Sequence, residues 1–206
     1  HTVHRIDRAT SGLVLMARSP ESASMISEQF RNRTVGKRYL ALLRGHLGEP
    51  TKVDRPVKRD RRDPTPADAV SYIEPLAWGT IPEPVGKFSE GWFTLASIIL
   101  ETGRHHQARK HCHYISHPII GDKHHGDRAQ NRFFQSRFHF QELFLRSYQL
   151  EFTDPGTGRR VRGVAGIGSR WRTVFDTIGV TIPGDYPVDP FVQAVEGADR
   201  ISGAKD

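Results

Sequence analysis

The sequence predicts an α+β domain built on a mainly antiparallel, mixed sheet with flanking helices. Strand-like and helix-like segments follow one another without the regular alternation that a parallel sheet requires. The chain has 206 residues, of which 36% are hydrophobic and 26% are charged, and this composition is typical of a globular domain with its own core. No apolar run approaches the roughly 18 residues that a membrane span needs. We therefore expect one globular domain.

The first part of the chain predicts two strands separated by a helix. The apolar run Gly12–Ala17 is typical of a buried strand. A serine, a proline and an acid at positions 19–21 suit the N-cap, the first position and the first turn of a helix. Apolar residues at helical spacing extend this helix to about Asn32, and Lys37–Arg44 predicts the second strand.

The middle of the chain predicts two further strands among loops. Asp54–Ala67 is rich in Arg, Lys, Asp and Pro, which indicates an exposed loop. Strands are expected over Ala69–Leu76 and Trp92–Glu101, with a Pro- and Gly-rich loop or hairpin tip over 80–90 between them. Five of the eight residues Arg55–Arg62 are basic, which suits contact with phosphates and simple hydration equally well.

The last part of the chain predicts a helix, a strand and a helix. Residues 105–116 are compatible with a helix that Pro118 stops. Leu143–Phe152 predicts a late strand, and Ser169–Ile178 predicts a helix with an inward apolar stripe. After about Pro187 the sequence becomes small and polar, so we expect a poorly ordered tail there.

Net charge and cysteine content indicate which class of partner the protein binds and which cellular compartment suits it. The net charge is +7 and the pI is near 9.8, which favours a polyanionic partner. Charge alone does not separate nucleic-acid binding from a solvated basic surface. The single cysteine, Cys112, cannot form an intramolecular disulfide, and a reducing compartment is compatible with that. We expect a cytoplasmic protein.

Two polar segments carry the residues that could perform chemistry. In the first, Asp7 is flanked by Arg5 and Arg8 directly before the apolar run. Nearby positive charge favours the ionised form of a carboxylate, although a surface ion pair that closes a loop is the simpler interpretation of this segment alone. The second segment is Thr102–His113. If it is helical, residues four apart share a face that could donate hydrogen bonds to phosphates or hold a carboxylate.

The histidines of the second segment raise the rival hypothesis of a metal-dependent hydrolase. Seven of the eleven histidines lie between His105 and His125, and His113 and His117 have a spacing that metal ligands on one helical face use. No acid accompanies them, however, and seven Lys or Arg residues between Arg104 and Arg137 oppose the binding of a cation. We expect no metal.

Four motifs, in this order along the chain, resemble those of the RluA-type pseudouridine synthases. The family carries His-Arg-Leu-Asp-x-x-Thr-Ser-Gly, a Lys-x-Tyr strand, Thr-Gly-Arg-x-His-Gln-aliphatic-Arg-x-His, and His-Pro-Ile-x-Gly-Asp. The matching residues here are His4–Gly12, Lys37–Tyr39, Thr102–His111 and His117–Asp122. The resemblance covers residues 1 to about 165. It implies the pseudouridine synthase fold with a central RNA-binding cleft, and an isomerase that needs no cofactor.

The resemblance also implies roles for single residues. Asp7 resembles the essential aspartate, which attacks either the ribose C1′ or the uracil C6. Tyr39 resembles the residue that stacks on the base and helps to remove the C5 proton, and Arg109 resembles the arginine that pairs with the aspartate. Arg5 resembles the side chain that fills the gap left by the flipped nucleotide. Further RNA contacts are expected from Arg8, Lys37, Arg104, His106, Gln107, Lys123, Arg128 and Arg132, with the basic residues Arg55, Lys58, Arg59, Arg61 and Arg62 as additional candidates.

The substrate is expected to be RNA, and tRNA in particular. Lys123–Asp127, followed by Gln130–Arg132, resembles the branch of the family that modifies uridine 65 in the acceptor stem of tRNA. A ribosomal RNA substrate is one alternative, and a catalytically silent RNA-binding protein on the same scaffold is another. We expect a monomer that binds neither a membrane nor a metal.

The sequence departs from the family pattern at three places. The family carries a strand and an Asn-Lys-Pro-containing segment before the aspartate motif, and this region is absent here. We therefore expect residues 1–187 to be an N-terminally incomplete catalytic domain and residues 188–206 to be a tail. Ala108 stands where a larger aliphatic residue is usual, and Leu145–Ser147 stands where Leu-His-Ala is expected.

Overall fold

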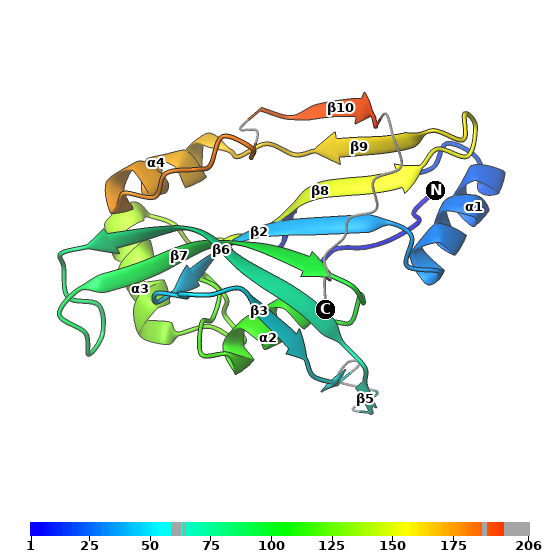
Figure 1. Ribbon diagram of the computed structural model, residues 1–206. Coiled ribbons are helices and arrows are strands. Elements are labelled where there is room, and N and C mark those ends of the chain that lie inside the picture. The colour runs from blue at the N-terminus through cyan, green and yellow to red at the C-terminus, as the bar shows by residue number, and fades with distance from the viewer. Residues whose placement is uncertain (59–62, 64, 187–188, 196–206) are drawn as a thin grey trace.

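The fold is given by a computed structural model, which describes residues 1–58, 63, 65–186 and 189–195 (Figure 1). The helices are α1 (Pro20–Arg31), α2 (Gln107–Tyr114), α3 (Arg128–Phe138) and α4 (Ser169–Ile178). The strands are β1 (Ser11–Gly12), β2 (Gly36–Arg44), β3 (Thr51–Asp54), β4 (Val57–Lys58), β5 (Pro66–Ala67), β6 (Val70–Ile81), β7 (Gly91–Leu100), β8 (Leu145–Thr153), β9 (Arg160–Val164) and β10 (Phe191–Ala194).

The described strands form one large sheet and one small ribbon. The eight-stranded sheet has the order β10-β9-β8-β2-β7-β6-β3, and β1 joins it by pairing with β8. The β1–β8 pair is parallel, and the other pairs of this sheet are antiparallel. β4 and β5 form a separate two-stranded ribbon. The predicted mixed, mainly antiparallel sheet is confirmed.

β2 is the centre of this sheet because its residues can be buried on both faces. Its segment from Leu40 to Leu43 is aliphatic and fully buried, between β7 on one side and β8 on the other. A strand with apolar residues at consecutive positions is stable only where both faces are covered. The polar start of β2 therefore leads from the surface into the core.

α2 and α4 contact opposite faces of β6. α2 lies on the face of the sheet that carries the Tyr39 side chain. Register pairs Tyr39 with Ile98 and Ile98 with Ile73, so these side chains share a face. Ser71 lies on that face, and the Gln107 side chain of α2 donates a hydrogen bond to it. Gly79, which pairs with Phe93, lies on the other face, where its missing side chain leaves room for Ile178 of α4.

Several predicted elements are confirmed to within a few residues. These are α1, β2, the β6–β7 hairpin, α2, β8 and α4. The helix expected from Ser19 begins at Pro20, and the Ser19 side chain accepts a hydrogen bond from the Ser22 main-chain N–H at 3.2 Å. α1 docks on the end of β8 through Gln29, whose amide exchanges two hydrogen bonds with the Thr153 main chain.

The prediction of a strand over Gly12–Ala17 is wrong. Only Ser11 and Gly12 are in a strand, and Val14 and Met16 are exposed. Gly12 has a φ of +103°, and a Cβ there would lie 2.2 Å from the carbonyl oxygen of Ser147. The chain thus approaches β8 closely at this glycine and then turns away from the sheet.

Six elements were not predicted: β3, β4, β5, α3, β9 and β10. The segment Asp54–Ala67 was expected to be an exposed loop, but β4 and β5 form a ribbon within it, and Val57 and Ala67 are buried. α3 has few apolar residues, and β9 is rich in arginine. β10 forms at 191–194, inside the region expected to be a poorly ordered tail, and pairs with β9; residues 187–188 and 196–206 lie outside the described residues. Among the described residues, no helix is long and apolar enough to span a membrane.

Candidate active site

Asp7 lies in the segment that leads into β1, where a turn fixes its main chain. The Thr10 N–H donates to the Asp7 carbonyl at 2.9 Å, and β1 then pairs with β8. The Asp7 side chain is 23% exposed. Its carboxylate is thus held at the edge of the protein, where a substrate can reach it.

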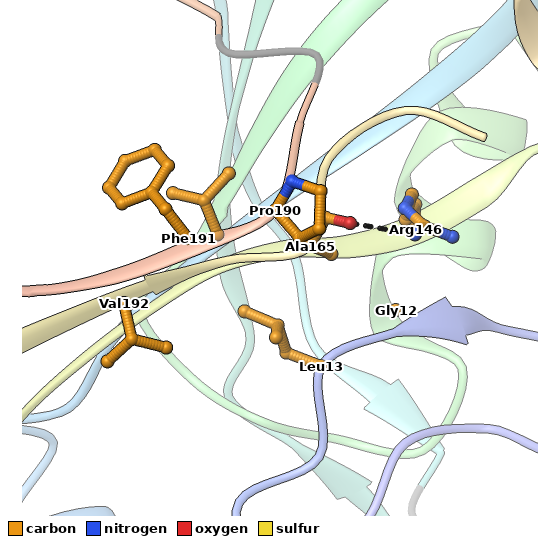
Figure 2. Close-up of a pocket in the computed structure, with 8 residues that line it drawn as sticks. Gly12, Leu13, Arg146, Ala165, Pro190, Phe191 and Val192 are labelled. Carbon is orange, nitrogen blue, oxygen red and sulfur yellow. Dashed lines mark hydrogen bonds between the residues drawn. The ribbon is translucent and has the colours of Figure 1, made fainter.

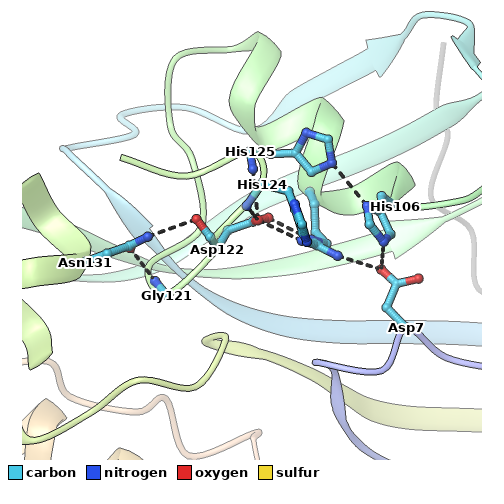
Figure 3. Close-up of polar contacts among 8 residues, drawn as sticks. Asp7, His106, Gly121, Asp122, His124, His125 and Asn131 are labelled. Atoms are coloured by element: carbon cyan, nitrogen blue, oxygen red, sulfur yellow. Dashed lines mark hydrogen bonds and ion pairs between the residues drawn. The ribbon is translucent and has the colours of Figure 1, made fainter. Parts of the chain in front are cut away.

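Arg109 faces Asp7 from α2 and is oriented by a second carboxylate, that of Asp122. Figure 3 labels the two carboxylates. Its Nε and Nη2 each donate to one oxygen of Asp122 at 2.7 Å. The remaining nitrogen, Nη1, lies 3.6 Å from Asp7 Oδ2. Because a two-point contact fixes the plane of a guanidinium, the edge that faces Asp7 is set before any substrate binds.

Asp122 collects four donors in a buried position. Besides Arg109, the main-chain N–H groups of His124 and His125 donate to its Oδ1 at 2.9 Å. Burial alone would raise the pKa of Asp122, but the hydrogen bonds from Arg109 and the main chain outweigh that effect and lower the pKa to about 2. The Asn131 side chain bonds to the main chain of Gly121 and Asp122, which fixes the loop that carries this carboxylate.

His106 is the other side chain next to Asp7. It precedes α2 in the left-handed conformation, with φ 54° and ψ 28°, and its Nε2 lies 4.0 Å from Asp7 Oδ2. Its Nδ1 lies 3.1 Å from Nε2 of His125. Burial, and then the positive charges of Arg109 and the neighbouring histidines, lower the pKa of His106 to about 4 against the opposing effect of Asp7. The ring is therefore neutral at pH 7.

Tyr39 approaches the same carboxylate from β2. The pairing of β2 with β8 shifts register between Arg38 and Tyr39, which is the signature of a bulge that can re-aim a side chain. Burial and the negative charge of Asp7 raise the pKa of Tyr39 to about 12. The phenol is therefore protonated at neutral pH. Asp7, Tyr39 and Arg109, which were predicted as a set, do lie together.

Lys37 lies at the start of β2, beside the Thr102–Arg104 turn. A Cβ on Gly103 would lie 3.7 Å from Lys37 Nζ, an ordinary van der Waals distance, so the turn and the lysine are direct neighbours. Burial and the charge of Arg33 lower the pKa of Lys37. Lys37 in turn adds to burial in lowering the pKa of His4, whose Nε2 accepts a hydrogen bond from the Leu15 N–H.

The other predicted RNA contacts divide into an exposed group and one buried residue. The exposed residues are Arg5, Arg8, Arg104, Lys123, Arg128 and Arg132. Gln107 is buried: its amide donates to Val70 O and Ser71 Oγ, and its oxygen accepts from Thr102 Oγ1 and Arg104 N. This network joins the start of α2 to β6, so Gln107 is corrected from an expected RNA contact to a structural residue.

The basic segment between β3 and β6 is attached to α2. His111 is buried and contacts both Ser71 Oγ and the Arg55 carbonyl, each at 2.9 Å. Lys110 donates to the Lys58 carbonyl at 2.9 Å, and the Arg55 guanidinium stacks over the Tyr114 ring at 3.7 Å. Of the further basic candidates, Arg59, Arg61 and Arg62 lie outside the described residues.

The histidine pair that raised the metal hypothesis does not share a helical face. α2 ends at Tyr114, so His117 lies beyond it, where its Nδ1 is 2.9 Å from the Arg44 carbonyl. Among the residues that the structure describes, no group of three or more His, Cys, Asp or Glu side chains is arranged to hold a metal ion.

No sequence pattern predicted the roles of two site residues, Asp122 and His125. Asp122 ends the fourth motif, and His125 lies in the Lys123–Asp127 segment that resembles one substrate branch. A lone acid followed by Lys-His-His is typical of a solvated loop, and its four converging donors come from α2 and from the loop itself. Only the Gly-Asp pair at the end of the fourth motif indicated a constrained position.

A separate pocket of about 440 Å³ lies beside β10. Figure 2 shows its apolar lining, to which Leu13 and Phe191 contribute from opposite sides. Arg146, at one of the positions that depart from the family pattern, donates to the Gly166 and Ala165 carbonyls at its wall. The pocket does not include Asp7, Tyr39 or Arg109.

Comparison with known proteins agrees with this geometry. Residues 1–114 match the family described as RNA pseudouridylate synthase. The chain is 35% identical over 186 residues to tRNA pseudouridine synthase C of Haemophilus influenzae, covering 86% of this chain and 78% of that protein. It is 36% identical over 188 residues to the protein of that name from Yersinia pestis, covering 87% and 73%.

Solved structures of two human proteins share the fold. Human RNA pseudouridylate synthase domain containing 4 superposes with a TM-score of 0.71 at 21% identity, covering 89% of this chain and 77% of that chain. Human RNA pseudouridylate synthase domain containing 1 gives a TM-score of 0.64 at 21% identity, covering 88% and 81%. The four motifs, their convergence around Asp7 and these relatives lead to one conclusion: the chain belongs to the RNA pseudouridylate synthase family.

Proposed function

We propose that this pseudouridine synthase modifies a uridine of tRNA and that Asp7 is its nucleophile. The observation that carries the proposal is the contact of the Asp7 carboxylate with Arg109, whose guanidinium is held in place by Asp122. A carboxylate nucleophile needs both ionisation and a fixed orientation. The relatives named tRNA pseudouridine synthase C and the 123–132 signature support tRNA, at uridine 65 of the acceptor stem.

The reaction rearranges bonds within one nucleotide, so it needs no metal or other cofactor. Asp7 attacks the ribose C1′ or the uracil C6, and the N1–C1′ bond breaks. The uracil turns and C5 bonds to C1′. The bond between Asp7 and the nucleotide breaks, which returns the carboxylate, and the C5 proton leaves as N1 gains one. A base stacked in a helix is shielded, so it must first be flipped out at a cost of a few kcal/mol.

We propose that Tyr39 stacks on the flipped base. A protonated phenol must lose its own proton before it can accept the one from C5, and both burial and the charge of Asp7 oppose that loss by raising the pKa of Tyr39 to about 12. The resting enzyme therefore favours stacking as the role of Tyr39. Any transfer of the C5 proton to it follows a change in the charge of Asp7.

Exposed cations around the site supply the contacts to the RNA backbone. Arg5 and Arg8 flank Asp7, Arg104 lies at the start of α2, and Lys123 follows Asp122. Arg128 and Arg132 extend the basic surface along α3. Neutralising phosphates releases counterions, and this gain can offset the cost of flipping the base. The segment with Arg55 and Lys58 adds to this surface from the other side of α2.

We further propose that residues 1–187, together with β10, which pairs with β9, form the catalytic domain and that the enzyme acts as a cytoplasmic monomer. A ribosomal RNA substrate and a silent RNA-binding protein are the alternatives. The presence of Asp7, Tyr39 and Arg109 in one cluster argues against the silent protein, because RNA binding alone does not need a buried carboxylate to orient Arg109.

Mapping of pseudouridine on unmodified tRNA transcript, at single-nucleotide resolution, tests the proposal. Asp7→Asn keeps the size of the side chain and removes its charge, and Asp176→Asn makes the same change on the exposed face of α4. We expect conversion of one acceptor-stem uridine by the wild type and by Asp176→Asn, and none by Asp7→Asn. Full activity of Asp7→Asn would refute the nucleophile. Conversion of a uridine in ribosomal RNA but not in tRNA would show that the substrate is ribosomal RNA.

A further inference from the structure

Two side chains approach Asp7 at the same oxygen. Arg109 Nη1 lies 3.6 Å and His106 Nε2 lies 4.0 Å from Oδ2. In the part of the chain that the structure describes, the ion pairs of Asp7 involve Oδ2 and not Oδ1. Figure 3 shows the His106 ring next to the Asp7 carboxylate, with His125 on its far side. The two oxygens of Asp7 therefore have different surroundings.

Arg109 and His106 differ in whether the nitrogen that faces Asp7 always carries a proton. Arg109 carries its donors permanently. His106 is neutral, and a neutral imidazole has one donor and one acceptor nitrogen. With the proton on Nε2, the ring attracts the Asp7 carboxylate; with the proton on Nδ1, a lone pair faces the carboxylate and repels it. The tautomer of His106 thus decides whether this residue helps to hold Asp7.

His125 is the group that can fix this tautomer. Its Nε2 lies 3.1 Å from Nδ1 of His106, a distance within the hydrogen-bonding range. When His125 Nε2–H donates, His106 Nδ1 accepts and the His106 proton must lie on Nε2, toward Asp7. The opposite direction of this bond would place two lone pairs of electrons, those of His106 Nε2 and Asp7, against each other. The negative charge of Asp7 selects the first arrangement.

The position of His125 depends on the same carboxylate that orients Arg109. The main-chain N–H of His125 donates to Asp122 Oδ1 at 2.9 Å, and Arg109 Nη2 donates to that oxygen at 2.7 Å. The ring of His105 stacks on His106 at 3.8 Å between centroids and limits its rotation. The buried carboxylate of Asp122 thus positions Arg109 directly and His106 through His125.

We propose that His106 and His125 are positioning residues, in which His125 holds the His106 tautomer that points Nε2–H at Asp7 Oδ2 and leaves Oδ1 to bond with the nucleotide. This inference rests on the proposed role of Asp7 as nucleophile. The His106–Asp7 distance of 4.0 Å must shorten by about 1 Å to reach hydrogen-bond length. Catalytic contacts that are long in the free enzyme commonly tighten when substrate binds.

A donor at Oδ2 acts on the covalent intermediate. When Oδ1 forms an ester with the nucleotide, Oδ2 becomes its carbonyl oxygen. When that ester breaks, negative charge returns to the carboxylate, and Oδ2 shares it. A fixed N–H at Oδ2 stabilises this returning charge. The pair is therefore expected to affect turnover more than binding of the RNA.

Variants of two histidines separate positioning from packing. His125→Phe keeps a ring and removes the donor, and His125→Gln restores an N–H. His46→Phe is the control, because His46 is exposed and its ring stacks on Trp78 at 5.1 Å between centroids. We expect kcat on tRNA to fall about tenfold or more in His125→Phe with KM within twofold, on the scale of other orienting residues. His125→Gln should recover most of kcat, and His46→Phe should match the wild type.

Long-range ¹H–¹⁵N NMR spectra of the full chain report the tautomer directly. We expect the His106 proton on Nε2 in the wild type, and a shift toward Nδ1 in His125→Phe that His125→Gln reverses. An unchanged tautomer and unchanged kcat in His125→Phe, at an unchanged melting temperature, would overturn the inference. If the wild type converts no tRNA uridine, the proposed function fails, while the spectra still decide the tautomer: a His106 proton on Nδ1 overturns the inference, and a proton on Nε2 that moves in His125→Phe supports it.

Discussion

The Asp122–Arg109 pair allows a quantitative prediction for Asp122→Asn. The two side chains are 1% and 4% exposed, so neither can be solvated if its partner is lost. Removing one member of a buried ion pair typically destabilises a protein by about 3–5 kcal/mol. The asparagine keeps one acceptor oxygen but places an N–H₂ group against a donor. We therefore expect a loss of about 3 kcal/mol in the free energy of unfolding.

Asp127→Asn is the matched control for this prediction. Asp127 also pairs with an arginine at 2.7 Å, Arg44, but these side chains are 25% and 28% exposed. An ion pair at such exposure is worth at most about 1 kcal/mol. Asp127 is the N-cap of α3, where its Oδ1 accepts from the main chain at 2.8 and 3.1 Å, and asparagine caps equally well. We expect a loss below about 1 kcal/mol.

Urea unfolding at pH 7, followed by circular dichroism, measures the free energy of unfolding of both variants. In thermal unfolding, the expected losses of free energy correspond to a decrease in melting temperature of roughly 10 °C for Asp122→Asn and of roughly 3 °C for Asp127→Asn. Equal losses in the two variants would refute the reasoning, because the variants share the pair distance and the chemistry and differ in burial.

The pH dependence of unfolding checks the same pair independently. The pKa of Asp122 is lowered from 3.8 to about 2, so the unfolded state binds its proton at higher pH than the folded state does. The resulting stability, roughly 2 kcal/mol, is present above pH 4 and is lost as the pH falls toward 2. The difference in stability between wild type and Asp122→Asn should therefore shrink by about 1 kcal/mol between pH 7 and pH 3. A constant difference would exclude the lowered pKa.

Three further predictions concern the surroundings of Asp7. Gly12→Ala should lose at least about 2 kcal/mol in urea unfolding, since its φ is +103° and its new Cβ would meet the Ser147 carbonyl, while Gly48→Ala, which meets no atom within 4 Å, should stay within about 0.5 kcal/mol. Tyr39→Leu should weaken tRNA binding by about 1–3 kcal/mol through lost stacking, whereas Tyr39→Phe should bind like the wild type; equal weakening in a filter-binding assay would contradict stacking. Arg8→Ala should flatten the slope of log Kd against log salt concentration by about 1, and an unchanged slope would remove Arg8 from the phosphate contacts.

Local signals in the sequence predicted the elements that depend on local interactions. α1 follows from a serine cap, a proline at the first position and an acid in the first turn, all of which act within a few residues. α4 follows from an apolar stripe that is buried as expected. The central strand β2 follows from its aliphatic run. These elements required no knowledge of the partners against which they pack.

The failures arise where a distant partner decides the conformation. Gly12–Ala17 is apolar enough for a strand, but the close approach of Gly12 to Ser147 turns the chain out of the sheet. β9 is partly exposed along most of its length and exists because it pairs with β8 and β10. No periodicity within five residues indicates such neighbours.

The site shows the same division. Spacing alone did not bring Asp7, Tyr39 and Arg109 together, because they lie on segments separated by tens of residues; only the resemblance to a family did so. Neither residue spacing nor the resemblance to a family predicted a functional role for Asp122. Its importance follows from four donors that meet at one buried carboxylate, and two of these are main-chain groups that carry no sequence signal.

In the proposed mechanism, Asp122 is a buried carboxylate that orients Arg109 and does not itself react with the nucleotide. Arg109 uses Nε and Nη2 on Asp122, so it presents only Nη1 to Asp7. Ordering this arginine is completed when the protein folds and is not repeated at each turnover, which is the condition for electrostatic preorganisation. The buried pair adds little net stability compared with apolar residues of the same size. Its retention in the core is therefore better explained by the orientation that it imposes on Asp7 than by its contribution to the free energy of folding.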